Sequence, residues 1–288
     1  MPEDPIRIEP LTTTAQFLDC EALQREIWGM EETDVVPLHL LTTMQRNGGL
    51  VLGAFEKERM VGFLMGFLGI DPADAGRLKH CSHMMGIARA WRGQGIGYRL
   101  KLAQREHALA QGLNLVTWTY DPLESANAAL NIGKLGAVAR SYIREVYGEL
   151  RDELNAGLPT DRLLVEWEIA ADRVAKRLAP QGGLLSPQDL PADSAQPVNP
   201  GAKMISGMLH PPEGWIAPED DLAAVEIPAA FQAIKERDPD LAMRWRLHTR
   251  ALFEHCFAAG FEVRGFVSER TADERRSHYV LYRRESDL

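Results

Sequence analysis

The chain has 288 residues, of which 45% are hydrophobic and 25% are charged, and its formal net charge is −9. This length suits one large or two modest domains, and the composition is that of an ordinary soluble globular protein. The acidic balance argues against a general nucleic-acid binder or a protein of anionic membranes, because both need a basic surface. Three cysteines make no disulfide framework and the chain opens without a signal-like segment, so we expect a cytoplasmic protein.

The first part of the chain predicts a short strand, two helices and a β-hairpin. We expect these elements at 6–8, 14–29, 37–47, 50–56 and 60–70, with the hairpin turning at Lys57-Glu58-Arg59. The apolar run 61–70 is only ten residues long, too short to span a bilayer. It therefore predicts a buried strand, and we expect no association with a membrane.

The segment after this hairpin carries the most informative pattern of the chain. An apolar strand over 80–88 leads into the sequence Arg-Gly-Gln-Gly-Ile-Gly at 92–97, and a helix with an apolar stripe follows as far as Gly112. Glycines let the backbone turn and approach a ligand closely. The first amide groups of a helix have no internal partner and point outward at the positive end of its dipole. Together these features predict a site for a phosphate or diphosphate group.

Two common phosphate-binding motifs do not fit this loop. The dinucleotide fingerprint Gly-x-Gly-x-x-Gly fails because Tyr98 stands in its last position. The Walker motif fails because Leu135, and not Ser or Thr, follows the chain's one Gly-Lys pair. The pattern Arg-x-x-Gly-x-Gly does fit, beginning at Arg92. Placed between a strand and a helix, it resembles the acetyl-CoA pyrophosphate loop of the GNAT superfamily of N-acetyltransferases.

The elements that follow agree with this resemblance. We expect a strand over 113–120 and a helix over 126–135, with Ser125 as its N-cap and Gly136 at its end. Strand–loop–helix–strand–helix–strand is the GNAT core order, and Lys-Leu-Gly-Ala at 134–137 is similar to the family's Lys-Leu-Gly-Phe ending. The phrase at 154–162, followed by Val-Glu-Trp at 165–167, resembles a subfamily of acetyltransferases with few characterised members. The resemblance covers about residues 6–170 and implies an α/β fold, a mixed and mostly antiparallel twisted sheet flanked by helices.

The second half of the chain begins with an irregular stretch. Residues 179–202 are rich in Pro, Gly, Ser and Asp, which predicts a linker or a long loop. A strand–helix–strand–strand order is expected after it, at 224–228, 239–259, 261–267 and 278–282. This order echoes half of a GNAT core without the glycine loop, so it predicts a degenerate half-repeat or a sheet extension. The chain then divides into a GNAT domain at 1–178, an irregular region at 179–222 and an extension at 223–288 that completes the substrate pocket or forms a homodimer surface.

The resemblance also implies a ligand and the residues that hold it. The ligand is acetyl-CoA or another acyl-CoA, used as co-substrate and without a metal. Its diphosphate is expected on the loop amides, and its pantetheine arm beside the strand and near an asparagine of the next helix. The residues expected to bind it are Met85, Gly86, Ile87, Arg92, Gly93, Gln94, Gly95, Ile96, Gly97, Tyr98 and Asn127.

Acyl transfer to an amine needs a base that works near neutral pH and a proton for the leaving thiolate. His83 is the candidate base, because the resemblance places its strand along the pantetheine and histidine titrates near the working pH. The alternative is a core histidine bonded to a neighbouring strand. Many GNAT enzymes carry a Tyr that protonates the leaving CoA thiolate at the position where this chain has Ile132. The substitutes that we expect are Tyr120 and either Tyr142 or Tyr147, and water is the alternative proton donor.

These residues predict an acyl-CoA-dependent N-acyltransferase. It would transfer an acetyl or another short acyl group, such as succinyl, directly to a small amine or amino acid in a ternary complex. One alternative is a non-catalytic acyl-CoA sensor, which Ile132 favours. Another is an interaction protein in which the C-terminal half blocks the cleft. No basic arm or aromatic motif indicates a nucleic acid as partner.

Overall fold

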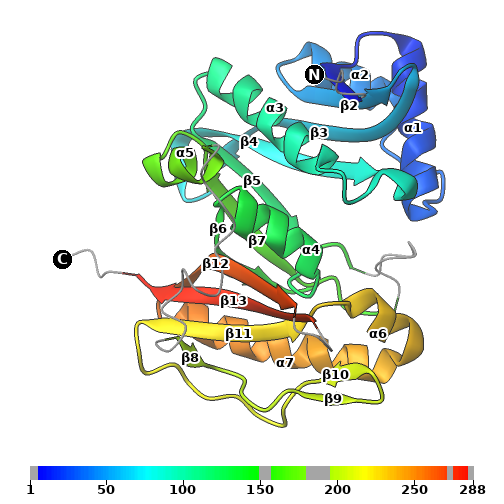
Figure 1. The fold of residues 1–288 in the computed structure, drawn as a ribbon. Helices are drawn as coiled ribbons and strands as arrows, with labels where there is room; N and C mark the ends of the chain where they lie inside the picture. Colours follow the sequence, from blue (N-terminus) through cyan, green and yellow to red (C-terminus); the bar gives the residue numbers. More distant parts are fainter. Residues whose placement is uncertain (1–5, 149–156, 180–194, 271–274, 285–288) are drawn as a thin grey trace. The chain divides into compact units, whose positions relative to one another are not determined.

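The computed structural model describes residues 6–148, 157–179, 195–270 and 275–284 (Figure 1). These residues form two compact units. The first unit consists of the described residues within 1–118 and 168–170, and the second consists of those within 119–150, 155–167 and 171–288. The boundary falls inside a strand and not at the end of residues 1–178, so the division inferred from the sequence stays a prediction. Residues 149–156 and 180–194, which carry parts of the subfamily phrase and of the expected linker, lie outside the described residues.

The first unit contains a sheet in the order β1-β2-β3-β4-β5. The four neighbours β1 to β4 are antiparallel, and β4 pairs with β5 in parallel. Their bounds are β1 Ile6–Pro10, β2 Leu50–Glu56, β3 Arg59–Asp71, β4 Asp74–Ile87 and β5 Leu115–Tyr120, the last of which continues into the second unit. The turn expected at 57–59 joins β2 to β3, with Lys57 at a φ of 52°.

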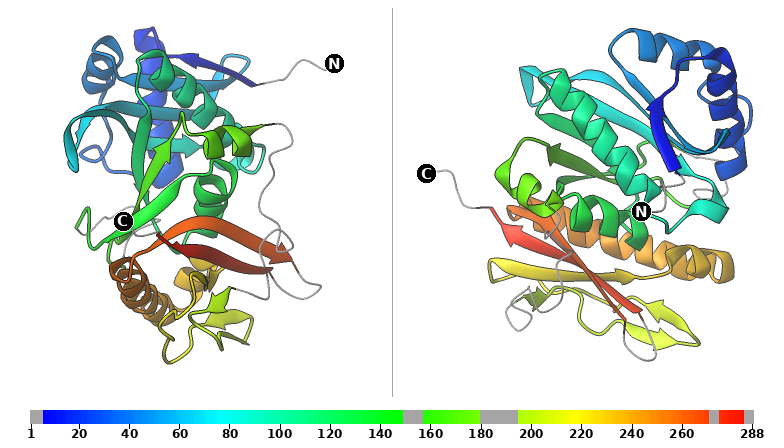
Figure 2. Two further views of the ribbon diagram at one scale, coloured as in Figure 1. Left: turned by 90° about the vertical axis from the view of Figure 1, so that its left-hand side faces the viewer. Right: turned by 45° about the horizontal axis from the view of Figure 1, so that its top comes forward.

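Helices cover both faces of this sheet (Figure 2). Helices α1 (Thr14–Trp28) and α2 (Leu38–Arg46) bury their apolar residues with Phe63 and Met65 of β3. Helix α3 (Ile96–Ala110) packs on the other face, where it contacts Val61 and Leu64 of the same strand. Successive side chains of a strand point to opposite faces, so β3 supplies both cores.

The second unit is built around a sheet in the order β7-β6-β12-β13-β11-β8. All neighbours are antiparallel except β11 and β8. The strands are β6 Val138–Ile143, β7 Arg162–Glu168, β8 Gln196–Pro197, β11 Leu222–Pro228, β12 Phe261–Arg270 and β13 Arg275–Arg283. A separate hairpin consists of β9 (Lys203–Ile205) and β10 (Met208–His210). The expected strand–helix–strand–strand order at the C-terminal end is present, and both final strands are longer than expected.

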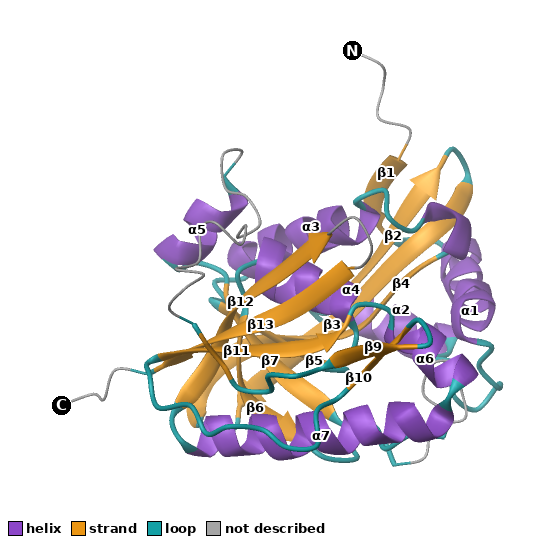
Figure 3. Ribbon diagram, turned by 60° about the horizontal axis from the view of Figure 1, so that its bottom comes forward, coloured by secondary structure: helices purple, strands orange, loops and turns teal. Residues whose placement is uncertain are grey.

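The main helix of this unit, α7 (Pro239–Ala258), is labelled in Figure 3 and packs against β6 and β12. Phe253 of α7 meets the ring of Tyr279 on β13 edge to face, with the centroids 5.3 Å apart. The remaining helices are α4 (Ser125–Ala128), α5 (Asp172–Leu178) and α6 (Phe231–Arg237). The helix expected over 126–135 begins as α4 and continues as a π-helical turn, η2 (Ala129–Lys134). The observed fold class is therefore the expected one, a mixed and mostly antiparallel sheet flanked by helices.

Candidate functional site

The loop between β4 and α3 has the backbone that the glycine pattern predicts. A single 3-10 turn, η1 (Arg89–Trp91), leads from β4 into it. Gly93 and Gly95 both have a φ of 78°, in the left-handed region that side chains disfavour, and Gly95 is the N-cap residue of α3. A Cβ atom built at either glycine would meet no other atom within 4 Å. The loop therefore needs glycine for its backbone conformation, and the space beside it is open to a ligand.

The amide groups at the start of α3 are available to that ligand. The first amide to bond along the helix is that of Arg99, which donates to the carbonyl oxygen of Gly95 over 3.1 Å. The amides of Ile96, Gly97 and Tyr98 precede it and have no acceptor within the helix. No side chain caps this end of α3. The N–H groups therefore face outward at the positive end of the helix dipole, where a diphosphate fits.

Two side chains of the loop donate hydrogen bonds to backbone carbonyl groups that precede it. The Nε group of Arg92 donates to the carbonyl oxygen of Ile87 over 3.1 Å. The side-chain amide of Gln94 donates to the carbonyl oxygen of Ala90 over 3.3 Å. Arg92 remains exposed at the surface. The structure thus brings together the whole predicted segment 92–98, with a guanidinium group beside the outward amides.

Strand β4 has one edge that is only briefly paired. It pairs with β3 as far as Ile87, but with β5 only at His80↔Val116 and Cys81↔Thr117. From Ser82 to Ile87, the strands that the structure describes give β4 no second neighbour. Such an edge offers N–H and C=O groups to an extended ligand. The predicted residues Met85, Gly86 and Ile87 lie on this edge.

Gly86 lies where the sheet meets helix α1 closely. A Cβ atom at this position would lie 2.7 Å from Ile27, 2.8 Å from Trp28 and 3.0 Å from Phe63. Contacts below 3 Å do not occur without displacement of the neighbours, so the packing of α1 requires glycine here. This explanation concerns the core and leaves the backbone edge of Gly86 available.

A β-bulge lies in β4 at His83. Met84 pairs with Met65 and Ser82 pairs with Gly66, so His83 is the extra residue that has no partner in β3. Before the bulge, Ser82 faces α3, where it bonds Lys101. After it, Met85 and Ile87 pack into the core that α3 covers. The bulge therefore turns His83 out of the regular alternation of the strand, as bulges beside functional sites do.

His83 is exposed, with its ring 6.0 Å from that of Phe67. Atoms packed around the ring lower the pKa of His83 below its ordinary value. A lowered pKa keeps the imidazole neutral at pH 7, which is the form that a base requires. The core histidine of this strand is His80, which is 0% exposed and has no hydrogen-bond partner for either ring nitrogen.

The two predicted tyrosines lie in the second unit. Tyr120 donates its hydroxyl proton to the hydroxyl oxygen of Tyr279 over 3.0 Å, and burial raises the pKa of Tyr120. Tyr142 donates to Oδ2 of Asp161 over 2.7 Å, and burial raises its pKa as well. Both hydroxyl protons are therefore engaged in hydrogen bonds within this unit. Asn127 is exposed on α4.

This geometry can be compared with that of known proteins. Residues 15–133 match the model of the acetyltransferase (GNAT) family. This segment, which is less than half of the chain, is therefore similar to the GNAT acetyltransferase domain. The match includes β4, the glycine loop, α3 and His83, and it ends before Lys134. A comparison with curated proteins gives no significant match.

Solved structures of GNAT proteins resemble the chain at low identity. The ribosomal-protein-S18-alanine N-acetyltransferase of Escherichia coli is 13% identical, with a TM-score of 0.45, over 58% of this chain and 95% of that one. An aminoglycoside 6'-acetyltransferase of type Ii is 15% identical, with a TM-score of 0.45, over 57% and 98%. A chain of the NatC complex bound to Gag peptide and CoA is 13% identical, with a TM-score of 0.44, over 57% of this chain and 98% of that one. Likenesses at this level decide neither substrate nor mechanism.

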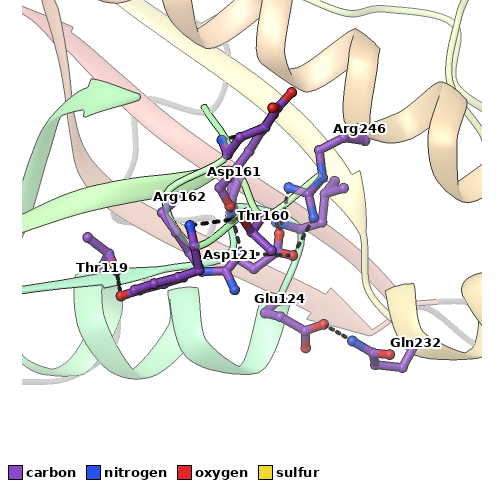
Figure 4. Close-up of polar contacts among 12 residues, drawn as sticks. Thr119, Asp121, Glu124, Thr160, Asp161, Arg162, Gln232 and Arg246 are labelled. Carbon is purple, nitrogen blue, oxygen red and sulfur yellow. Dashed lines mark hydrogen bonds and ion pairs between the residues drawn. The ribbon is translucent and has the colours of Figure 1, made fainter. Parts of the chain in front are cut away.

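The second unit also contains an ion-pair network that the sequence did not predict (Figure 4). Arg246 forms a two-point contact with Asp121, and Arg250 forms another with Asp161, at 2.7 and 2.9 Å. Burial alone would raise the pKa of Asp161, but hydrogen bonds from Arg250 and Tyr142 outweigh it and lower the pKa. The i, i+4 spacing of the two arginines on α7 was the only available signal, because it places them on one helix face.

Glu124 lies at the N-cap position of α4, next to this network in Figure 4. Its carboxylate accepts a 2.6 Å hydrogen bond from the side-chain amide of Gln232. Burial raises the pKa of Glu124, and the negative charge of Asp121 raises it further. Among the described residues, no group of three or more His, Cys, Asp or Glu side chains is placed to hold a metal ion. None of the described helices is both long enough and apolar enough to cross a membrane.

Proposed function

We propose that this protein transfers an acyl group from acyl-CoA to the amino group of a small molecule. The observation that carries the proposal is the pairing of two features in one unit. Outward helix amides follow the glycine loop, and an open edge of β4 with a bulged, exposed histidine leads into that loop. The first feature suits a diphosphate, and the second suits an extended amide-containing arm and a proton transfer.

The residues of the first unit have distinct roles in this proposal. The amides of Ile96, Gly97 and Tyr98 bind the diphosphate, and Arg92 adds a positive charge. The free backbone groups between Ser82 and Ile87 bind the pantetheine arm. The CoA thioester supplies an acyl group that is activated for attack by an amine. Asn127 remains a proposed ligand for the arm.

His83 is the proposed base. An amine acceptor is protonated at neutral pH and must lose a proton before it attacks the thioester. The neutral imidazole of His83 can accept this proton, directly or through a water molecule. The bulge holds the ring at the surface, where an acceptor can reach it.

The leaving thiolate takes a proton from Tyr120, from Tyr142 or from water. The hydrogen bonds of both tyrosines favour water, because each hydroxyl would have to give up a buried partner to donate elsewhere. Thiolates are good leaving groups at neutral pH, with a free thiol pKa of about 8.5. The absence of a tyrosine at Ile132 therefore does not prevent the reaction.

The acceptor class follows from charge. The net charge of −9 attracts cationic amines and gives no reason to propose a nucleic acid as acceptor. We propose a small amine or an amino acid as acceptor, and an acetyl or another short acyl chain as the transferred group. The second candidate function is a non-catalytic acyl-CoA sensor, which Ile132 and the engaged tyrosine hydroxyls favour.

The test combines binding and turnover. Isothermal titration with acetyl-CoA, succinyl-CoA and free CoA should give dissociation constants in the micromolar range, about −8 kcal/mol in binding free energy. Release of free thiol should then be measured with a panel of small amines. Binding together with turnover supports the transferase. Binding without turnover on any amine supports the sensor, and no binding of any of the three ligands rejects both.

A further inference from the structure

We propose that Lys101 is a positioning residue, which holds the β4 bulge and thereby His83 in the geometry needed for acyl transfer. The inference rests on the proposed function. It assigns a task to a buried amine that neither the family match nor the sequence pattern explains.

Lys101 lies in the second turn of α3 and is only 2% exposed. Its Nζ donates to Oγ of Ser82 over 2.8 Å and to Oε1 of Gln104 over 3.2 Å. The same nitrogen lies 3.6 Å from the centroid of the Trp118 ring. One amine therefore joins α3, β4 and β5.

The two strand contacts lie at a special place in the sheet. The last pair between β4 and β5 is Cys81↔Thr117. Ser82 and Trp118 are the next residues of the two strands, so Lys101 contacts both at the first position beyond the last pair. Ser82 is also the residue directly before the bulge at His83. The amine thus lies where the strands stop pairing and where the bulge begins.

The energetics indicate that this arrangement is not optimised for stability. Burial lowers the pKa of Lys101 well below its ordinary value, and no carboxylate of the described residues pairs with it. Nε2 of Gln104 and both ring nitrogens of His80 lie in the same region without hydrogen-bond partners. Each unpartnered buried polar group destabilises the fold, because its lost bonds to water are not replaced. An apolar side chain would fill the same space at lower cost, and such departures from core design are typical of functional sites.

The task of the amine follows from its contacts. A bulge can move along a strand unless the residues beside it are fixed. The bond to Ser82 fixes the residue on the N-terminal side of the bulge, and Met85 is held on the other side by the core under α3. Without the amine we expect Ser82 to become mobile and His83 to lose its fixed orientation. A displacement of about 1 Å at a reacting group can lower a rate by about a hundredfold.

The test uses Lys101→Met, which keeps the length of the side chain and removes the amine. We expect kcat to fall at least about tenfold, whereas the dissociation constant for CoA changes less than about twofold because the loop amides remain in place. The melting temperature should stay the same or rise, because a desolvated amine is removed. Lys176→Met, at an exposed position of α5, is the matched control and should change none of the three quantities.

A double-mutant cycle with Ser82→Ala separates positioning from general disruption. If Lys101 acts through Ser82, the double variant should lose no more activity than the stronger single variant. Multiplicative losses would overturn the inference, and so would a Lys101→Met variant with the kcat of the wild type. A loss of CoA affinity that matches the loss of kcat would also overturn it.

A further readout does not depend on turnover. The imidazole resonances of His83, assigned by comparison with His83→Gln, should shift or broaden in Lys101→Met. Unchanged resonances would overturn the inference even if the protein proves to be a sensor. Failure of CoA to bind the wild type would instead reject the proposed function, so the two failures are distinguishable.

Discussion

Tyr142 donates its hydroxyl proton to Asp161, a carboxylate that is 0% exposed and that Arg250 also contacts with two nitrogens. This relationship makes Tyr142 part of the scaffold of the second unit. We expect Tyr142→Phe to lower the free energy of unfolding by about 1–3 kcal/mol, because one hydrogen bond to a buried carboxylate is lost. We expect kcat to change less than threefold, because water can protonate the leaving thiolate. Urea unfolding and steady-state kinetics measure the two effects, and a large fall in kcat with unchanged stability would restore Tyr142 as the acid.

The loop glycine Gly95 can be tested against a glycine at the other end of the same helix. Gly95→Asp places a carboxylate beside the expected diphosphate, and we expect CoA affinity to fall by about a hundredfold or more, given the charge repulsion and the lost backbone geometry. Gly112 has a φ of 75° and open space around its Cβ position, so Gly112→Asp introduces the same side chain and similar backbone strain. Titration with CoA should show normal affinity for this control. Equal CoA affinities in the two variants would show that the diphosphate does not bind at this loop.

Replacing His83 should change the pH dependence of the reaction. The base must be unprotonated, so activity falls as the pH falls through the pKa of His83. Because the atoms packed around the ring lower that pKa, we expect the acidic limb of kcat/KM below about pH 6.5. His83→Gln should lower kcat by about 10²–10⁴-fold, remove this limb and leave CoA affinity nearly intact. A variant that retains the limb would show that another group titrates.

His80 should make the stability of the first unit sensitive to acid. Burial lowers its pKa to about 4, whereas the unfolded chain has a histidine pKa of about 6.5. Between these values the unfolded state binds more protons, so stability is fully present above about pH 6.5 and is lost as the pH falls towards 4. The full effect is on the order of 3 kcal/mol. Urea unfolding at pH 7 and pH 5 should show a smaller decrease for His80→Phe than for the wild type, and equal decreases would contradict the assignment.

The elements of the first unit could be predicted because their signals are local. Apolar periodicity and the punctuation by glycine are read within a few residues, and the loop at 92–97 is a contiguous motif. The predicted loop residues and the strand residues before them accordingly lie together in the structure. The bulge at His83 could not be predicted, because it depends on the register between β4 and β3 and not on the sequence of β4 alone.

Contacts between distant residues escaped prediction for a similar reason. Arg246 and Asp121 are 125 residues apart, and Arg250 and Asp161 are 89 apart. A single sequence gives the charges but not their partners. The same limit applies to Lys101, which reads as one more cation on a solvated helix face until the structure shows it buried against Ser82 and Trp118.

The strand order of the second unit has a consequence for synthesis on the ribosome. Strand β6 pairs with β12 through Val263↔Ala139, and β12 and β13 are the last strands of the chain. Residues 119–148 therefore leave the ribosome long before β12, the strand that completes their sheet, has been synthesised. In the first unit, by contrast, β1 to β4 can pair with their neighbours soon after they emerge. Long sequence separation between partners slows folding and leaves apolar strands exposed in the meantime. The nascent second unit is thus the part of this protein that should depend most on chaperones, and premature termination before β12 should yield an insoluble product.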